Sequence, residues 1–128
     1  MHLLPTPAAA DYDRRQDLAR ENRDGSGGDD LVTTAVKATK ESDWGKYDAA
    51  IARWEQITRP APAGTEPNSR GNPRLNPQFS EWMMGWEAGW ATDAGISRND
   101  ALKIIGNGVV PHQAAAAITW LLSLVGTR

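Results

Sequence analysis

Two groups of residues in this chain have the types and spacing that could bind a ligand. Gly106-Asn107-Gly108 places an amide that donates and accepts hydrogen bonds between two glycines, which let a backbone turn tightly or approach a bound molecule. Taken alone, this triplet indicates only a turn. Arg59, Arg70 and Arg74 lie in or beside a proline-rich stretch, where their guanidinium groups could follow a phosphate backbone. The same arginines could instead serve only to keep a loop soluble.

The composition excludes several kinds of chemistry. The 128 residues include no cysteine, which rules out disulfides, thiolate zinc sites and cysteine nucleophiles within this sequence. His2 and His112 lie far apart, so no metal site is expected. The net charge of -2 provides no overall positive field for nucleic acid. Residues 31–75 carry seven Lys and Arg against five Asp and Glu, or +2, and phosphate contacts are expected there.

The polar composition of the first half of the chain predicts that it buries few apolar side chains. Residues 1–30 are crowded with charge and end in a glycine-rich break, which favours a disordered tail, whereas residues 31–40 could form a short helix. Ser42 or Asp43 can cap the next helix. Its apolar residues recur at spacings of three and four, which predicts one apolar stripe: Tyr47, Ile51, Trp54 and Ile57.

A loop is expected between the two parts of the chain. Pro60 disfavours helical geometry at the residue before it and so ends the preceding helix. From Pro60 to Arg74 the chain holds four prolines and two glycines, which is typical of a linker. This loop places the internal boundary between residues 1–75 and residues 76–128.

Helix signals are clearer in the second half. Asn76 is a good cap, Pro77 suits the first helical position, and Gly85 suits a helix end. Ser97 can cap another helix, with Asp100 in the position of a reciprocal capping partner. Pro111 can begin a last helix, in which five residues share an apolar face: Ala114, Ile118, Leu121, Leu122 and Val125. These signals predict a mainly helical, small and irregular fold, with three or four helices after residue 42.

Six tryptophans could stack on nucleic acid bases. Because most occur at helical spacing, we favour a place in a core or in an interface with another domain. The apolar run from Val109 to Val125 is interrupted by Pro111, His112 and Gln113, and is too short and polar to be expected to span a bilayer. No signal peptide is evident, so a soluble, cytoplasmic protein without a membrane partner is predicted.

Two motifs in the second half give a more specific indication. The first is Leu75-Asn76-Pro77-Gln78-Phe79-Ser80-Glu81-Trp82-Met83-Met84-Gly85-Trp86, followed by Gly89-Trp90. The second is Gly106-Asn107-Gly108-Val109-Val110-Pro111. In this order and spacing they resemble the end of the DNA (cytosine-5)-methyltransferases. Leu3-Leu4-Pro5-Thr6-Pro7 and the segment from Trp44 to Glu55 also resemble the target-recognition region of phage and actinobacterial members.

The resemblance implies a role for each part of the chain. Residues 1–75 would be a partial target-recognition region that contacts double-stranded DNA. Residues 76–128 would be a helical segment that packs on the catalytic domain, so the chain would be the C-terminal fragment of an α/β, Rossmann-like enzyme. Asn107, Gly108 and Val109 would lie beside the methionine part of S-adenosylmethionine. Arg59, Arg70 and Arg74 would position DNA phosphates.

Departures from the family pattern accompany this resemblance. Many members carry Ser or Ala where this chain has Gly108, and Trp86-Glu87-Ala88 replaces the usual leucine-proline turn. The family's Pro-Cys nucleophile motif, its Glu-Asn-Val motif and its glycine-rich cofactor loop do not occur. This chain alone therefore cannot methylate cytosine by the covalent route, and no residue in it is assigned a catalytic role. Three hypotheses remain: a split enzyme completed by a catalytic methyltransferase subunit, a non-catalytic DNA-binding module, and a truncated remnant.

Overall fold

A computed structural model describes residues 4–12, 30–41 and 43–126. Part of the predicted disordered tail, residues 1–3 and 13–29, lies outside the described residues, as does Ser42, but Ala9–Tyr12 forms a short 3-10 helix with a buried Asp11. Two short 3-10 helices, five α-helices and one pair of strands occur in the described part: η1 (Ala9–Tyr12), α1 (Leu31–Glu41), η3 (Gly45–Tyr47), α2 (Asp48–Ile57), β1 (Thr65–Pro67), β2 (Pro73–Leu75), α3 (Pro77–Met83), α4 (Arg98–Asn107) and α5 (Pro111–Gly126). The prediction of a mainly helical, small and irregular fold is confirmed.

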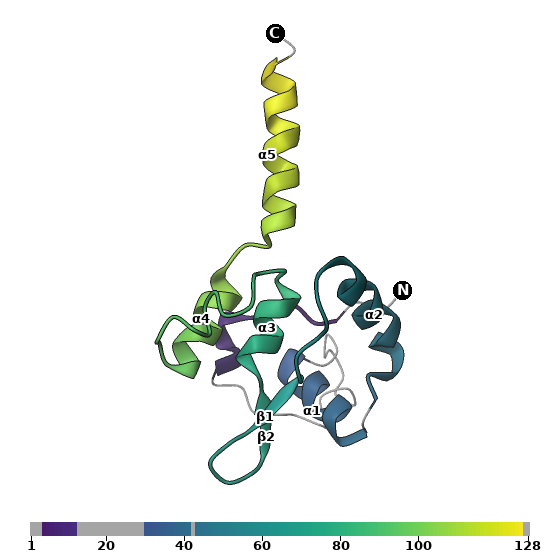
Figure 1. Ribbon diagram of the computed structural model, residues 1–128, viewed down its shortest axis with the longest axis vertical. Helices are drawn as coiled ribbons and strands as arrows, with labels where there is room; N and C mark the ends of the chain where they lie inside the picture. Colours follow the sequence, from purple (N-terminus) through teal and green to yellow (C-terminus); the bar gives the residue numbers. More distant parts are fainter. Residues whose placement is uncertain (1–3, 13–29, 42, 127–128) are drawn as a thin grey trace, which may run out of the picture.

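Most elements gather in one body, from which the helix α5 and the loop of the β1–β2 hairpin project. Figure 1 shows α1, α2, α3 and α4 around the strand pair, with α5 leaving this body as a separate rod. The loop of the β1–β2 hairpin extends at the opposite end. The hairpin loop, which contains Arg70, and the last helix therefore lie toward different ends of the molecule.

The core lies where α1, α2, α3 and α4 meet. Its buried apolar side chains come from both halves of the sequence: Leu31, Val32, Ala35, Ile51, Leu75, Phe79, Trp82 and Leu102. The Trp44 ring stacks on Phe79 with 5.0 Å between ring centroids and 11° between planes. Trp82 is fully buried, and Trp54 packs at the edge of the cluster. These three tryptophans are core residues, as predicted, whereas Trp90 and Trp120 are exposed.

The beginning of α2 differs from the prediction. Its N-cap position is Tyr47, which makes no side-chain capping bond. Asp43 instead accepts a hydrogen bond from the Gly45 N–H at 2.7 Å, and it lies one residue before Trp44, the N-cap position of the short η3 turn that precedes the helix. The predicted apolar stripe is also shorter than expected, because Ile51 is buried but Ile57 is 62% exposed.

The predicted loop from Pro60 to Arg74 contains an antiparallel hairpin. Thr65 pairs with Leu75, and Pro67 pairs with Pro73 at the end of the short ladder next to the turn. The carboxamide oxygen of Asn68 accepts hydrogen bonds from the N–H groups of Arg70 and Asn72, which closes the turn. A ladder of three pairs with a proline in each strand lacks the alternating pattern that announces a strand, and the sequence prediction missed it for this reason.

The capping predictions for α3 and α4 are confirmed. The Asn76 side chain accepts a hydrogen bond from the Gln78 N–H, and Pro77 is the first helical residue. Gly85 follows the helix with φ of 71°, the left-handed geometry expected of a glycine at a helix end. Ser97 accepts from the Asp100 N–H at 3.1 Å. The Asp100 carboxylate accepts a hydrogen bond from the Ser97 hydroxyl at 2.7 Å, where a reciprocal cap would accept one from a backbone N–H.

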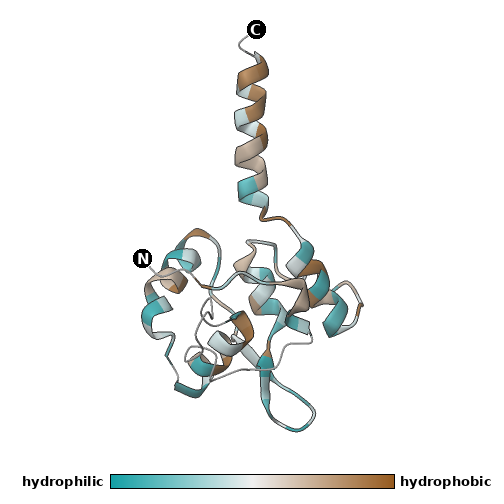
Figure 2. Ribbon diagram, turned by 180° about the vertical axis from the view of Figure 1, so that it is seen from behind, coloured by the Kyte–Doolittle hydropathy of each residue, from teal (hydrophilic) through white to brown (hydrophobic). Residues whose placement is uncertain are grey.

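The final helix α5 meets the body at its first turn, where the His112 ring lies edge-on to Trp54 with 6.2 Å between ring centroids, and then projects away from it (Figure 1). None of its residues is buried, and its predicted apolar face is exposed to solvent. Figure 2 shows the apolar colouring continuing along most of its length. The segment Arg98–Gly126 is long and apolar enough by length and composition to cross a membrane. The chain changes direction between α4 and α5, however, and the 16 residues of α5 span only about 24 Å.

Candidate cofactor turn and arginine groups

The turn predicted to contact a cofactor joins α4 to α5. Asn107 is the last residue of α4, and Gly108 caps the helix with its N–H donating to the Ile105 carbonyl at 3.1 Å. Ile105 is fully buried in a small second cluster with Met84 and Ala91. Asn107, Gly108 and Val109 remain exposed on top of that cluster.

The two glycines of this turn are not required by their backbone angles, contrary to the expectation of a tight glycine turn. Gly106 lies within α4, and Gly108 has φ of -76° and ψ of 172°, which any residue adopts. Gly106 is needed because the backbone of Ala8 and Ala9 passes where a Cβ would be. The close approach expected of these glycines is therefore made by the chain's own N-terminal segment at Gly106.

At Gly108 the space is taken by Trp86. The six-membered ring of the Trp86 indole lies where a Cβ at Gly108 would be. The indole Nε1 also donates a hydrogen bond to the Val109 carbonyl at 3.1 Å. Sequence reasoning did not assign Trp86 to this site. The available signal was its place in the segment that departs from the family's leucine-proline turn.

Arg59 lies beside this turn and apart from the other two predicted arginines. Its Nη1 donates to the Trp86 carbonyl at 2.7 Å. Its own carbonyl accepts from the Trp82 indole Nε1 at 2.8 Å. The Trp82 carbonyl in turn accepts from the Trp54 Nε1 at 2.9 Å. Arg59 thus belongs to a hydrogen-bonded group of tryptophans that links α2 and α3 to the turn.

Arg70 and Arg74 lie on the hairpin, where the structure adds Arg98 from α4. Glu66 Oε1 forms ion pairs with Arg74 Nη2 and Arg98 Nε, both at 3.0 Å. Arg98 Nη2 also donates to the Leu75 carbonyl at 2.6 Å. Burial, and then the nearby Arg74 charge, lower the pKa of Arg98 from its ordinary value. Arg98 was missed because its neighbours lie more than 20 residues away in the sequence.

The three hairpin-side arginines border one polar groove of about 770 Å³. Asn68, Asn72 and Asn99 contribute amides to the same groove. Glu66 neutralises one of the three guanidinium charges by direct ion pairing. Arginine side chains contact both phosphates and guanine edges in DNA, and asparagine side chains contact adenine edges.

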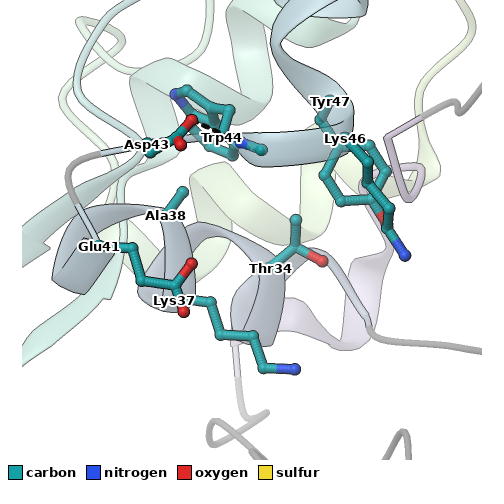
Figure 3. Close-up of a pocket in the computed structure, with 9 residues that line it drawn as sticks. Thr34, Lys37, Ala38, Glu41, Asp43, Trp44, Lys46 and Tyr47 are labelled. Atoms are coloured by element: carbon teal, nitrogen blue, oxygen red, sulfur yellow. Dashed lines mark hydrogen bonds between the residues drawn. The ribbon is translucent and has the colours of Figure 1, made fainter.

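A second pocket, of about 360 Å³, lies between α1 and η3. Figure 3 shows Lys37 and Lys46 with their ammonium ends directed away from it, so its polar groups do not converge. The pKa of Asp43 is lowered, first by the hydrogen bond from the Gly45 N–H. The pKa of Asp48 is raised, first by its side-chain hydrogen bond with Asp43. Both carboxyl groups are exposed to solvent, and Asp48 is not among the residues that line the pocket.

The described residues contain no candidate metal centre. Within them, no group of three or more His, Cys, Asp or Glu side chains is placed to hold a metal ion. Comparisons with protein-family models, with curated proteins and with solved structures find no match to this chain. Any functional proposal therefore depends on the chain's own motifs and on the geometry of the turn, the hairpin and α5.

Proposed function

We propose that this chain is the C-terminal portion of a DNA (cytosine-5)-methyltransferase and requires a catalytic subunit. It would contribute DNA target recognition and part of the S-adenosylmethionine pocket, while the cysteine nucleophile comes from the catalytic subunit. The observation that carries the proposal is the uncovered apolar helix α5, which directly follows the Gly106-Asn107-Gly108-Val109-Val110-Pro111 motif.

The surface of α5 needs a partner for physical reasons. No Asp, Glu, Lys or Arg occurs between Lys103 and Arg128. Six large apolar side chains on α5 are at least half exposed: Ile118, Trp120, Leu121, Leu122, Leu124 and Val125. Burying one such side chain contributes about 1.5–3 kcal/mol, so docking would be strongly favoured. A helix that is apolar on most sides is normally enclosed by other elements, and the resemblance supplies a Rossmann-like sheet as the occupant.

The turn before α5 fits a cofactor contact in one respect. Asn107 is exposed and carries both a donor and an acceptor, as the polar methionine end of S-adenosylmethionine requires. The Val109 carbonyl is already engaged by Trp86, which leaves the Asn107 side chain as the principal contact from this chain. When bound, the cofactor supplies the methyl group that is transferred to cytosine. The side chain of Asn107 would orient it.

The hairpin would provide the contact with double-stranded DNA. Arg70 stands at its exposed tip, and Arg74 lies along β2 with a 43% exposed side chain. Because Arg74 is paired with Glu66 while Arg70 is further out, Arg70 is the stronger candidate for a phosphate contact. A non-catalytic DNA-binding module would use this same hairpin, and the experiment below separates the two functions.

A methyl-transfer assay tests the proposal. The transfer of labelled methyl groups from S-adenosylmethionine to DNA is measured for this chain, for a protein that carries a Pro-Cys motif, and for their mixture. We expect activity only in the mixture. A Leu121→Lys variant should abolish it, because the substitution places a charge on the expected docking face of α5.

Thr119→Lys is the matched control, since it adds the same charge to an exposed polar position of the same helix. Activity of this chain alone would contradict the need for a partner. DNA binding without methyl transfer in a mixture with a well-folded catalytic protein would favour the binding module. Full activity of the Leu121→Lys mixture would show that α5 does not dock through the face that contains Leu121.

A further inference from the structure

A continuous series of hydrogen bonds leads from α2 to the turn before α5. Trp54 donates to the Trp82 carbonyl, and Trp82 donates to the Arg59 carbonyl. Arg59 donates to the Trp86 carbonyl, and Trp86 donates to the Val109 carbonyl. Each bond is 2.7–3.1 Å long, within the ordinary range for N–H donors. No other described side chain donates a hydrogen bond across to this turn.

Packing at Gly108 makes the last contact of the series specific. The backbone angles of Gly108 would accept any residue, so the glycine is required chiefly by the Trp86 ring that lies against it, while the Ile104 carbonyl oxygen would lie 3.3 Å from a Cβ. Two of the departures from the family pattern are therefore in contact with each other. A large ring at residue 86 and the absence of a side chain at residue 108 form one complementary packing arrangement.

We propose that Trp86 is the positioning residue of the α4–α5 turn and that Arg59 holds Trp86 in place. Trp86 holds the Val109 carbonyl in place. It thereby sets the direction in which α5 leaves the body and keeps the Asn107 side chain facing outward. Neither residue touches a reacting atom, so neither is catalytic. The effect on methyl transfer rests on the proposed function, whereas the effect on the turn does not.

Arg59 thereby has a role different from the DNA-phosphate contact expected from the sequence. Its guanidinium is directed at a backbone carbonyl within the protein, and its own backbone carbonyl is occupied by Trp82. The Arg70 side chain, at the hairpin tip, is exposed and makes no hydrogen bond or ion pair with another described residue. Replacing Arg59 should therefore disturb Trp86, whereas replacing Arg70 should weaken the contact with DNA.

A double-mutant cycle tests the contact between residues 86 and 108 in the full chain without any partner. Gly108→Ala should lower the thermal midpoint and shift the indole N–H resonance of Trp86, because the new methyl group displaces the ring. In a Trp86→Leu background the same alanine should cost little, since the obstructing ring is gone. Gly126→Ala is the matched control, because a Cβ there meets nothing within 4 Å. An equal cost of Gly108→Ala in both backgrounds would overturn the proposal.

Arg59→Met and Arg70→Met separate positioning from DNA contact. Arg59→Met should move the Trp86 indole resonance and leave the salt dependence of DNA binding unchanged. In the reconstituted assay it should raise KM for S-adenosylmethionine more than it lowers kcat. Arg70→Met should leave the indole resonance unchanged.

The indole N–H resonance of Trp86 distinguishes a failure of the proposed function from a failure of the positioning role. Absence of methyl transfer together with a shifted Trp86 signal would contradict the proposed function and retain the positioning role. An unshifted Trp86 signal in Arg59→Met, with a flatter dependence of DNA affinity on salt, would overturn the positioning role and return Arg59 to a phosphate contact.

Discussion

Glu81 accepts a hydrogen bond from the backbone N–H of Ala91 at 2.6 Å, although its carboxylate is fully buried. The same carboxylate accepts from the Gly89 N–H and from the hydroxyl and N–H of Thr92. One side chain on α3 thus holds the segment that leads to α4. This explains how a buried carboxylate is tolerated, because its oxygens are satisfied by four donors.

Glu81→Gln should destabilise the chain by about 1–3 kcal/mol, because the new amide directs a donor at backbone donors in a buried site. Urea denaturation measures the change in the free energy of unfolding. Glu87→Gln, at an exposed position of the same segment, is the control and should change little. Equal midpoints for the two variants would contradict the anchoring role of Glu81.

Arg98→Met should loosen the hairpin. It removes the bond to the Leu75 carbonyl and one of the two ion pairs of Glu66, for an expected cost of about 1–3 kcal/mol. Hydrogen exchange at the β2 amides should accelerate. Arg70→Met, which removes a charge from the exposed tip, should leave that exchange rate unchanged. Unaltered exchange in Arg98→Met would show that the hairpin is held by its own ladder alone.

Leu102→Ala and Leu122→Ala remove the same side chain from a buried and an exposed helix. Leu102 is 2% exposed in the core, so its loss should cost about 2–5 kcal/mol. Leu122 is 65% exposed on α5, so the isolated chain should lose less than about 0.5 kcal/mol. Calorimetry of both variants makes the comparison. A large loss in Leu122→Ala would mean that α5 is already covered, and the docking argument would fail.

Arg70→Met should make the affinity for DNA fall less steeply as the salt concentration rises. Each phosphate contact contributes about 0.9 to the slope of log affinity against log salt concentration, so one lost contact should lower it by about that amount. Arg74→Met should have a smaller effect, because Arg74 is already paired with Glu66. Fluorescence anisotropy with duplex DNA at several salt concentrations measures both slopes. Identical slopes for Arg70→Met and the unaltered chain would exclude Arg70 as a phosphate contact.

The amino-acid sequence by itself determined where several helices begin and end. The Asn76 and Ser97 caps, the left-handed Gly85 and the start of α5 at Pro111 all depend on residues within a few positions of each other. Such interactions leave a local pattern because their partners are neighbours in the chain. The two motifs that predict the cofactor turn are local in the same sense.

The tertiary structure decided which of the predicted site residues lie together. Arg59 meets Trp86 across 27 positions, and Arg98 meets Glu66 across 32. The folding of distant segments onto one core creates these contacts, and no spacing rule connects such residues in a single sequence. The exposure of α5 is also a tertiary result, since the same apolar pattern would describe a helix buried against a neighbour. Local chemistry thus set the elements, and long-range packing set their contacts.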